Sequence, residues 1–209
     1  MQKARNSRVG SEIPESRLAG ETITCGSYGG KGRKAPSLPV PISKTMDIIE
    51  ATPKDAGPVM ALISDCTKDM EASGTYQWDD EYPTREAIEV DIANRSLHIL
   101  RIEDKYCGII ALDGDEPQEY GDIDWKYKTD KVLVVHRLAV DPQWQRQGIA
   151  RRLMDFAEQY GQINGYQAIR LDAFIKNPKA IKLYECRRYR KAGTVIFRKR
   201  LFYCFENTL

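Results

Sequence analysis

One strand–loop–helix segment in the second half of the chain constrains the fold more than any other feature. The longest apolar run, residues 132–140, predicts a buried strand. After a short polar loop, apolar residues recur at spacings of four, three, four and three and predict an amphipathic helix over residues 149–163; they are Ile149, Leu153, Phe156, Tyr160 and Ile163. A strand that passes through a short loop into a long helix indicates an α/β domain.

The loop between these two elements has the composition of an anion site. The run Gln145-Arg146-Gln147-Gly148-Ile149-Ala150 leads into the helix N-terminus, where backbone N–H groups without intrahelical partners and the helix dipole favour negative charge. Gly148 allows close approach of the backbone, and Arg146, Arg151 and Arg152 add cationic groups. A pyrophosphate is the expected ligand, although many solvated helix starts carry one Gly and several Arg.

The rest of the chain from Met46 predicts helices and strands in mixed order. Thr84 is expected to cap the second helix, and Asn177, followed by Pro178, the last one. The expected elements are strand 47–51, helix 54–70, a helix after Thr84, strands 97–101 and 106–112, strand 167–174, a helix from Asn177, and strands 194–197 and 201–205. We therefore expect one α/β domain over residues 46–209, with hairpins and a crossover.

Residues 1–45 differ from this domain in composition. They contain six Gly, four Pro and eight Lys or Arg against three Glu, and apolar residues follow no helix or strand period. We expect a disordered leader. It is either an added or upstream-translated segment or a native basic tail, and the start of the strand pattern directly after Met46 favours the first interpretation.

Charge and cysteine usage narrow the class of protein. A formal net charge of +2 gives no electrostatic reason to expect nucleic acid as a partner, and no run of about 18 apolar residues predicts a membrane span. Five widely spaced cysteines without a C-x-x-C pair indicate reduced thiols and no metal site. These features predict a soluble cytoplasmic protein.

Two motifs together resemble a known superfamily. Leu138-Ala139-Val140-Asp141-Pro142 followed by Gln145-x-x-Gly148-x-Ala150 resembles the acetyl-CoA signature of the GNAT superfamily of N-acetyltransferases. Asn177-Pro178-x-Ala180-x-x-Leu183-Tyr184-Glu185 looks like the second CoA-contacting motif of that superfamily, and the chain resembles uncharacterised bacterial members, among other places in the segment from Tyr76 to Tyr82. One departure is Arg188-Tyr189, where many members have Gly-Tyr or Gly-Phe, which puts the shape of this turn in question.

The resemblance implies a mixed, largely antiparallel sheet with a splayed pair of strands and flanking helices. It also implies acetyl-CoA as co-substrate, with the backbone of residues 138–140 beside the pantetheine arm and Val140 polarising the thioester carbonyl. Asn177 is expected to contact the cofactor, or to act only as a helix cap. The expected cofactor-binding residues are Leu138, Ala139, Val140, Gln145, Arg146, Gln147, Gly148, Ile149, Ala150, Arg151 and Asn177.

Two residues are candidates for proton transfer. Tyr184 resembles the tyrosine that protonates the departing thiolate in many relatives, or it is a core aromatic of an amphipathic helix. His136 is expected, from strand alternation, on the same face as Leu138 and Val140, and imidazole titrates near neutral pH. It is either the base, as a similarly placed histidine is in arylalkylamine N-acetyltransferases, or a structural histidine.

The acceptor is expected beside Trp78, Asp79 and Tyr82. The rings of Trp78 and Tyr82 can frame an amine while Asp79 holds its ammonium group. Alternatively, the two rings simply pack the connection between the helices. Because no cysteine lies in either motif, direct attack in a ternary complex is expected rather than an acyl-enzyme. The expected acceptor is a primary amine of a small molecule, with a homodimer as a possible assembly. The alternatives are a protein or peptide amine and a non-catalytic acyl-CoA-binding module.

Overall fold

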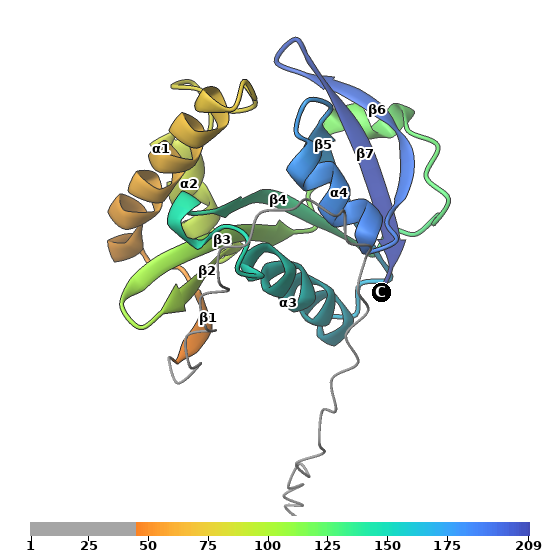
Figure 1. Cartoon of the computed structure of the whole chain (residues 1–209). Coiled ribbons are helices and arrows are strands. Elements are labelled where there is room, and N and C mark those ends of the chain that lie inside the picture. Colours follow the sequence, from red (N-terminus) through yellow and green to blue (C-terminus); the bar gives the residue numbers. More distant parts are fainter. Residues whose placement is uncertain (1–44) are drawn as a thin grey trace, which may run out of the picture. The chain divides into compact units, whose positions relative to one another are not determined.

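The computed structural model describes residues 45–209, so the prediction of a disordered leader falls almost wholly outside the described residues. Within them, four α-helices flank one seven-stranded open sheet (Figure 1). In chain order the elements are β1 (Met46–Glu50), η1 (Pro53–Asp55), α1 (Ala56–Ala72), α2 (Arg85–Ala93), β2 (Leu97–Ile102), β3 (Lys105–Asp113), η2 (Gln118–Asp122), β4 (Val132–Val140), η3 (Pro142–Trp144), α3 (Ile149–Ile163), β5 (Ala168–Phe174), α4 (Pro178–Cys186), β6 (Arg190–Phe197) and β7 (Arg200–Thr208).

The sheet confirms the expected fold class. Its strand order is β1-β2-β3-β4-β5-β7-β6, and every neighbouring pair is antiparallel except β4 and β5. This parallel pair is short: residues 132–135 of β4 pair with residues 168–171 of β5, and the pairing ends there although both strands continue. The two strands therefore separate in the middle of the sheet, which gives the splayed pair.

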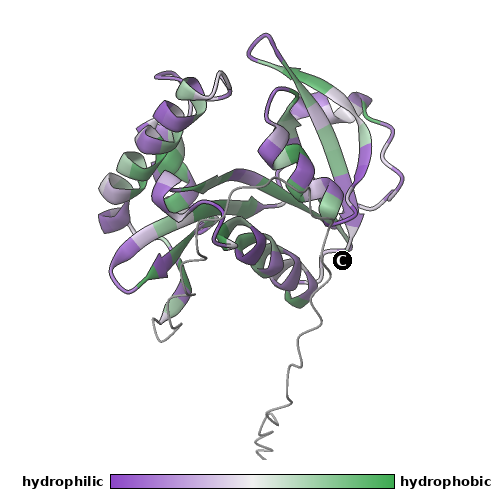
Figure 2. Cartoon of the chain, in the orientation of Figure 1, coloured by the Kyte–Doolittle hydropathy of each residue, from purple (hydrophilic) through white to green (hydrophobic). Residues whose placement is uncertain are grey.

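Apolar side chains cover both faces of the sheet. Buried residues of α1 and α2, among them Val59 and Ile88, pack with β2 and β3 on one face. Leu153 of α3 and Tyr184 of α4 pack with β4, β5 and β7 on the other. Figure 2 shows the same division, with hydrophobic positions concentrated along the strands and on the inner sides of the helices. The core is thus divided by the sheet that contains the splayed pair.

The helix after the Gly148 loop begins and ends where the sequence predicts, but its predicted buried stripe is partly wrong. Ile163 is 75% exposed. The buried face instead consists of Ile149, Leu153, Met154, Ala157 and Gly161. A Cβ on Gly161 would lie 2.3 Å from Leu209 Cδ1 and 3.1 Å from Leu133 Cδ2. Small residues let α3 lie close to the sheet, and a periodic pattern of large apolar residues does not reveal them.

A bulge in β4 overturns the predicted orientation of His136. His136 lies opposite Ala111 and Ala139 lies opposite Ile109, so two residues of β4 stand against one of β3 between these pairs. Arg137, in the bulge, has φ of +47°. The extra residue reverses the alternation, so His136 shares a face with Ala139. The expectation that it shares a face with Leu138 and Val140 is wrong.

The connection between β3 and β4, residues 114–131, is held by its own contacts. It carries η2, whose Tyr120 is buried with Trp125 in a third apolar cluster against β7. The indole of Trp125 donates to the carbonyl of Tyr120 at 3.1 Å, and Arg170 of β5 lies over the Trp125 ring. This β3–β4 segment, an acidic stretch without clear periodicity in the sequence, is therefore an ordered part of the fold.

Three further observations concern residues 45–209. None of the helices in this range combines the length and apolar character needed to cross a membrane. The cysteines in this range, Cys66, Cys107, Cys186 and Cys204, are free thiols. Nothing in the described range groups three or more His, Cys, Asp or Glu side chains in a way that suits a metal ion.

Candidate active site

A cavity of about 300 Å³ opens where β4 and β5 separate. Its wall combines the α1–α2 segment (residues 73–84), the separated parts of β4 and β5, α4, the β3–β4 segment and the tip of the β6–β7 hairpin. The lining residues that matter below are Trp78, Tyr82, Glu119, His136, Arg137, Leu138, Asp172, Asn177, Tyr184, Arg198 and Arg200. The cavity thus brings together both candidates for proton transfer and part of each predicted binding set: Tyr184, His136, Leu138, Asn177, Trp78 and Tyr82.

The edge of β4 offers backbone groups to this gap. Val140 lies opposite Gly108 of β3, while the N–H of the next residue, Asp141, donates to Cys107 O at 3.1 Å. Neighbouring residues of a strand turn their backbone groups to opposite edges, so the N–H and C=O of Val140 face away from β3, toward the gap. The Val140 carbonyl accordingly accepts from two side chains, the Cys66 thiol at 3.3 Å and Gln145 Nε2 at 3.4 Å.

The N-terminus of α3 keeps the properties expected of an anion site. Gly148 is the N-cap residue with φ of +84°; no side chain caps this helix and its first turn has no acidic residue. The guanidinium groups of Arg146, Arg151 and Arg152 are solvent-exposed, and none forms an ion pair with a carboxylate within residues 45–209. Positive charge is therefore uncompensated around the first N–H groups of this helix.

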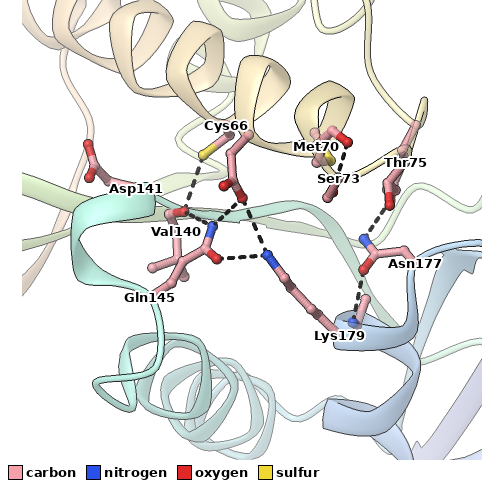
Figure 3. Close-up of polar contacts among 12 residues, drawn as sticks. Cys66, Met70, Ser73, Thr75, Val140, Asp141, Gln145, Asn177 and Lys179 are labelled. Atoms are coloured by element: carbon pink, nitrogen blue, oxygen red, sulfur yellow. Dashed lines mark hydrogen bonds and ion pairs between the residues drawn. The ribbon is translucent and has the colours of Figure 1, made fainter.

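A polar bridge of Asp69, Gln145 and Lys179 spans the space beside Val140. Gln145 Nε2 donates to Asp69 Oδ2 at 3.1 Å, and Lys179 Nζ donates to Gln145 Oε1 at 3.0 Å and to Asp69 Oδ2 at 3.3 Å. Figure 3 shows Gln145 and Lys179 pointing toward each other from the α3 side and from α4. These three residues join α1, α4 and the loop that precedes α3. We call the group the cofactor-side bridge, because it lies beside Val140, where the pantetheine arm is expected.

Tyr184 lies deep in the wall formed by α4. Its ring packs against Tyr189 and Phe205, and only 4% of the residue is exposed. Its hydroxyl has no hydrogen-bond partner within the described part of the chain, although the residue lines the cavity. Burial, with the nearby charge of Asp172, raises the pKa of Tyr184 well above its usual value, so the phenol stays protonated. The side chain is both a core aromatic and a protonated phenol that lines the cavity.

Two groups that can accept a proton lie on the other side of the splay. His136 Nε2 lies 3.1 Å from Asp113 Oδ1, and the side chain is 18% exposed at the cavity wall. Asp172 on β5 is the first residue after the last β4–β5 pair, and Tyr120 donates to its Oδ2 at 3.0 Å. Sequence reasoning missed Asp172, because inside a strand an isolated aspartate carries no motif; the signal was an acidic residue within a predicted apolar strand.

The acceptor end is crossed by ion pairs that involve Asp79, the residue expected to hold the ammonium group. Arg198 and Arg200, at the tip of the β6–β7 hairpin, donate to the two oxygens of Asp79 at 2.7 and 2.8 Å. Arg200 also donates to Gln77 O at 3.1 Å. We call these three charged residues the Asp79 clasp. Two guanidinium groups already compensate the charge of this carboxylate, and Asp79 itself does not line the cavity.

The two aromatic residues expected near the acceptor do line the cavity. Trp78 is 6% exposed and packs with α1 and α2, so it also belongs to the core. The Tyr82 hydroxyl accepts from Arg137 Nη1 at 3.1 Å, and Arg137 also forms an ion pair with the buried Asp91. The bulge directs Arg137 into this contact, and thereby joins β4 to α2 beside the cavity.

Asn177 is a helix cap with a second contact. Its Oδ1 accepts from Ala180 N at 3.1 Å and its Nδ2 donates to Gln77 Oε1 at 2.8 Å, so the side chain ties α4 to the α1–α2 segment. The remaining motif residues contribute mainly backbone: the side chains of Ala139 and Ile149 are buried in the core, and Gln147 Nε2 donates to Gln143 O. Ala150 follows in the first turn of α3.

The turn with Arg188 keeps a shape that usually selects glycine. Arg188 has φ of +63°, in the left-handed region. Tyr189 is nevertheless buried, and its hydroxyl donates to Glu158 Oε1 at 3.0 Å. The departure in sequence therefore leaves the turn after α4 intact, and the cost is a strained backbone at Arg188.

Comparison with known proteins agrees with this geometry. The family model described as "Acetyltransferase (GNAT) family" matches residues 63–187. A GNAT-family acetyltransferase from Streptococcus agalactiae superposes with a TM-score of 0.67 and 22% identity, over 78% of this chain and 95% of that one. A GNAT-family acetyltransferase from Listeria monocytogenes gives 0.65 and 21%, over 78% and 95%.

A third structure was solved with a bound ligand. The PaiA N-acetyltransferase of Thermoplasma acidophilum, in complex with coenzyme A, superposes with a TM-score of 0.62 and 13% identity, over 79% of this chain and 99% of that one. A comparison with curated proteins finds no significant match. Because the family match spans more than half of the sequence and the fold agrees, the chain belongs to the GNAT acetyltransferase family and is an acyltransferase.

Proposed function

We propose that the protein transfers an acetyl group from acetyl-CoA to a primary amine of a small molecule, by direct attack in a ternary complex. The observation that carries this proposal is the arrangement along the β4–β5 splay: Tyr184, with its unpartnered hydroxyl, and Leu138 line one cavity, and further along the same strand the backbone of Val140 faces away from β3. A non-catalytic acyl-CoA-binding module has no need of a buried proton donor in such a cavity.

The cofactor is assigned by charge and by the open strand edge. The pyrophosphate would bind at Gly148 and the N–H groups that follow it, near the unpaired Arg146 and Arg151. The pantetheine arm would run along residues 138–140 like an added strand, because the backbone of Val140 faces away from β3. The Thermoplasma acidophilum structure of the same fold, solved in complex with coenzyme A, supports coenzyme A as the group bound. Gln145 would then release the Val140 carbonyl, so the cofactor-side bridge opens on binding.

The chemistry follows from where charge develops. As the amine nitrogen bonds to the thioester carbon, negative charge grows on the carbonyl oxygen, and the N–H of Val140 is the donor placed to stabilise it. The C–S bond then breaks and the sulfur leaves as a thiolate. Tyr184 donates its proton to this thiolate, because its phenol is protonated and faces the cavity. The Cys66 thiol is not an acyl carrier, because burial first, and then nearby carboxylates, raise its pKa to about 12.

The Asp79 clasp supports a small acceptor rather than a polypeptide. It ties the α1–α2 segment to the β6–β7 hairpin with two ion pairs, and Arg198 also pairs with Glu81 at 3.2 Å. A chain passing between these two segments would have to break these pairs. A compact amine can enter the cavity beside Trp78 while the clasp stays closed.

Replacement of Tyr184 by Phe tests the proposal. The change keeps the ring packing and removes only the hydroxyl, so kcat should fall about 10²–10⁴-fold while acetyl-CoA affinity stays near that of the wild type. Steady-state kinetics and calorimetry measure the two quantities. Tyr189→Phe is the matched control, because that hydroxyl is bound to Glu158 and the residue does not line the cavity. Wild-type turnover in Tyr184→Phe would remove the proton donor from the scheme.

A further inference from the structure

The acceptor amine needs a partner that neither motif supplies. An amine of lysine type is mostly an ammonium ion at neutral pH, so the site must attract a cation and then remove a proton. Asp79 is occupied by two guanidinium groups. The only acidic residues that line the cavity within the described range are Glu119, which is exposed to solvent, and Asp172, which lies at the splay itself.

We propose that Asp172 binds the ammonium group of the acceptor and takes the proton that the amine must lose before it attacks the thioester. This inference rests on the proposed function. Val134 pairs with Arg170, so two residues further along the separating strands His136 and Asp172 lie on the same face. Tyr184 belongs to the opposite face, with α3 and α4. The proton acceptor and the proton donor therefore flank the thioester from different sides of the sheet.

The surroundings of Asp172 favour it over His136 as the acceptor of the proton. The nitrogen Nε2 of His136 already contacts Asp113, whereas Tyr120 occupies only one carboxylate oxygen of Asp172. A carboxylate also attracts the incoming ammonium group, and an imidazole does not. His136 then remains a neighbour whose charge acts on Asp172.

Titratable groups from four elements face Asp172. They are His136 on β4, Tyr120 on η2, Cys204 on β7 and Tyr184 on α4. Burial raises the pKa of Asp172 to about 6, while the Tyr120 hydrogen bond and the His136 charge oppose this rise. The group is therefore ionised at neutral pH and more basic than an ordinary aspartate, which suits a general base.

The protons balance in this scheme. The ammonium nitrogen loses one proton to Asp172 and forms the C–N bond as the C–S bond breaks. Tyr184 protonates the sulfur, and the second nitrogen proton replaces the one that Tyr184 gave. The proton on Asp172 passes to solvent, so the products are an amide, a thiol and one released proton.

Asp172→Asn and Tyr120→Phe test this assignment through pH–rate profiles with acetyl-CoA and an amine that the wild type acetylates. Asp172→Asn should lower kcat/KM for the amine about 10²–10⁴-fold and abolish the acidic limb. Tyr120→Phe removes a hydrogen bond that lowers the pKa of Asp172, so it should move this limb to higher pH. Asp122→Asn, an exposed carboxylate of the same 3-10 helix, is the control and should keep the wild-type profile.

Stability and cofactor binding separate a chemical role from misfolding. Burial disfavours the ionised form of Asp172, so the Asn variant should melt no lower than the wild type at pH 7, and its acetyl-CoA affinity by calorimetry should be unchanged. A wild-type rate and acidic limb in Asp172→Asn would overturn the inference and leave the acetyltransferase assignment standing. Failure of the wild type to acetylate any amine would reject the proposed function and this inference with it.

Discussion

Gly148 shows how one residue connects backbone shape with ligand charge. Its φ of +84° requires a conformation that few residues adopt, while an added Cβ would meet no heavy atom within 4 Å. The position is therefore selected by conformation and, in the proposed complex, by the phosphate that lies against it. Asp and Asn both tolerate left-handed φ and have nearly the same shape, so they differ here only in charge.

We expect Gly148→Asp to bind acetyl-CoA at least about tenfold more weakly than Gly148→Asn, because a carboxylate at the start of α3 repels a pyrophosphate and neutralises the helix N-terminus. Calorimetric titration of the two variants measures the difference. Equal affinities would mean that the pyrophosphate binds elsewhere. The comparison with Asn, rather than with wild-type Gly, removes backbone strain from the result.

At the scale of elements, Gly108 of β3 lies where β3, β4 and α3 pack closely together. A Cβ on Gly108 would lie 2.9 Å from the carbonyl oxygen of Ala139, 3.0 Å from Leu153 Cδ1 and 3.1 Å from Ile149 Cγ2. Gly108→Ala should therefore lower the free energy of unfolding by about 1–3 kcal/mol, because backbone and helix must both shift. Thermal and denaturant melts measure this loss.

Gly57 in α1 provides the control for that change. A Cβ there would meet nothing within 4 Å, so Gly57→Ala should leave stability unchanged or raise it by up to about 1 kcal/mol through helix propensity. Because Gly108 lies opposite Val140, Gly108→Ala should also weaken acetyl-CoA binding. If the Gly108→Ala variant were as stable as the Gly57→Ala variant, β3 and α3 would not be tightly packed.

Elements with a strong local signal were predictable from the sequence, and long-range geometry was not. The Thr84 and Asn177 caps are confirmed, since each side chain accepts from the N–H three residues later. The β4 bulge was missed because a bulge depends on how β3 pairs with β4, which no pattern within β4 reveals. The same holds for the Asp79 clasp, whose partners lie more than a hundred residues apart.

At the scale of the whole domain, the site lies between two parts of the sheet, β1–β4 and β5–β7, which share only the short pairing of β4 with β5. Beyond the short β4–β5 ladder, polar contacts join α1 and the α1–α2 segment to the other part: Asp69 to Lys179, Thr75 to the Lys176 carbonyl, Gln77 to Asn177, and Asp79 to Arg198 and Arg200. The motifs predicted the residues that are proposed to hold the cofactor. Asp172 and the clasp belong to no motif and depend on the tertiary arrangement, so the proposal for the acceptor half required the structure.

The most direct test of the account is a panel of acceptors incubated with acetyl-CoA, with released thiol and acetylated product measured together by absorbance and mass spectrometry. At least one small primary amine should yield its N-acetyl product in a one-to-one ratio with thiol, and peptides with free amino groups should react far more slowly. Thiol release without an acetylated amine, or acetyl-CoA binding without turnover on any member of the panel, would contradict it.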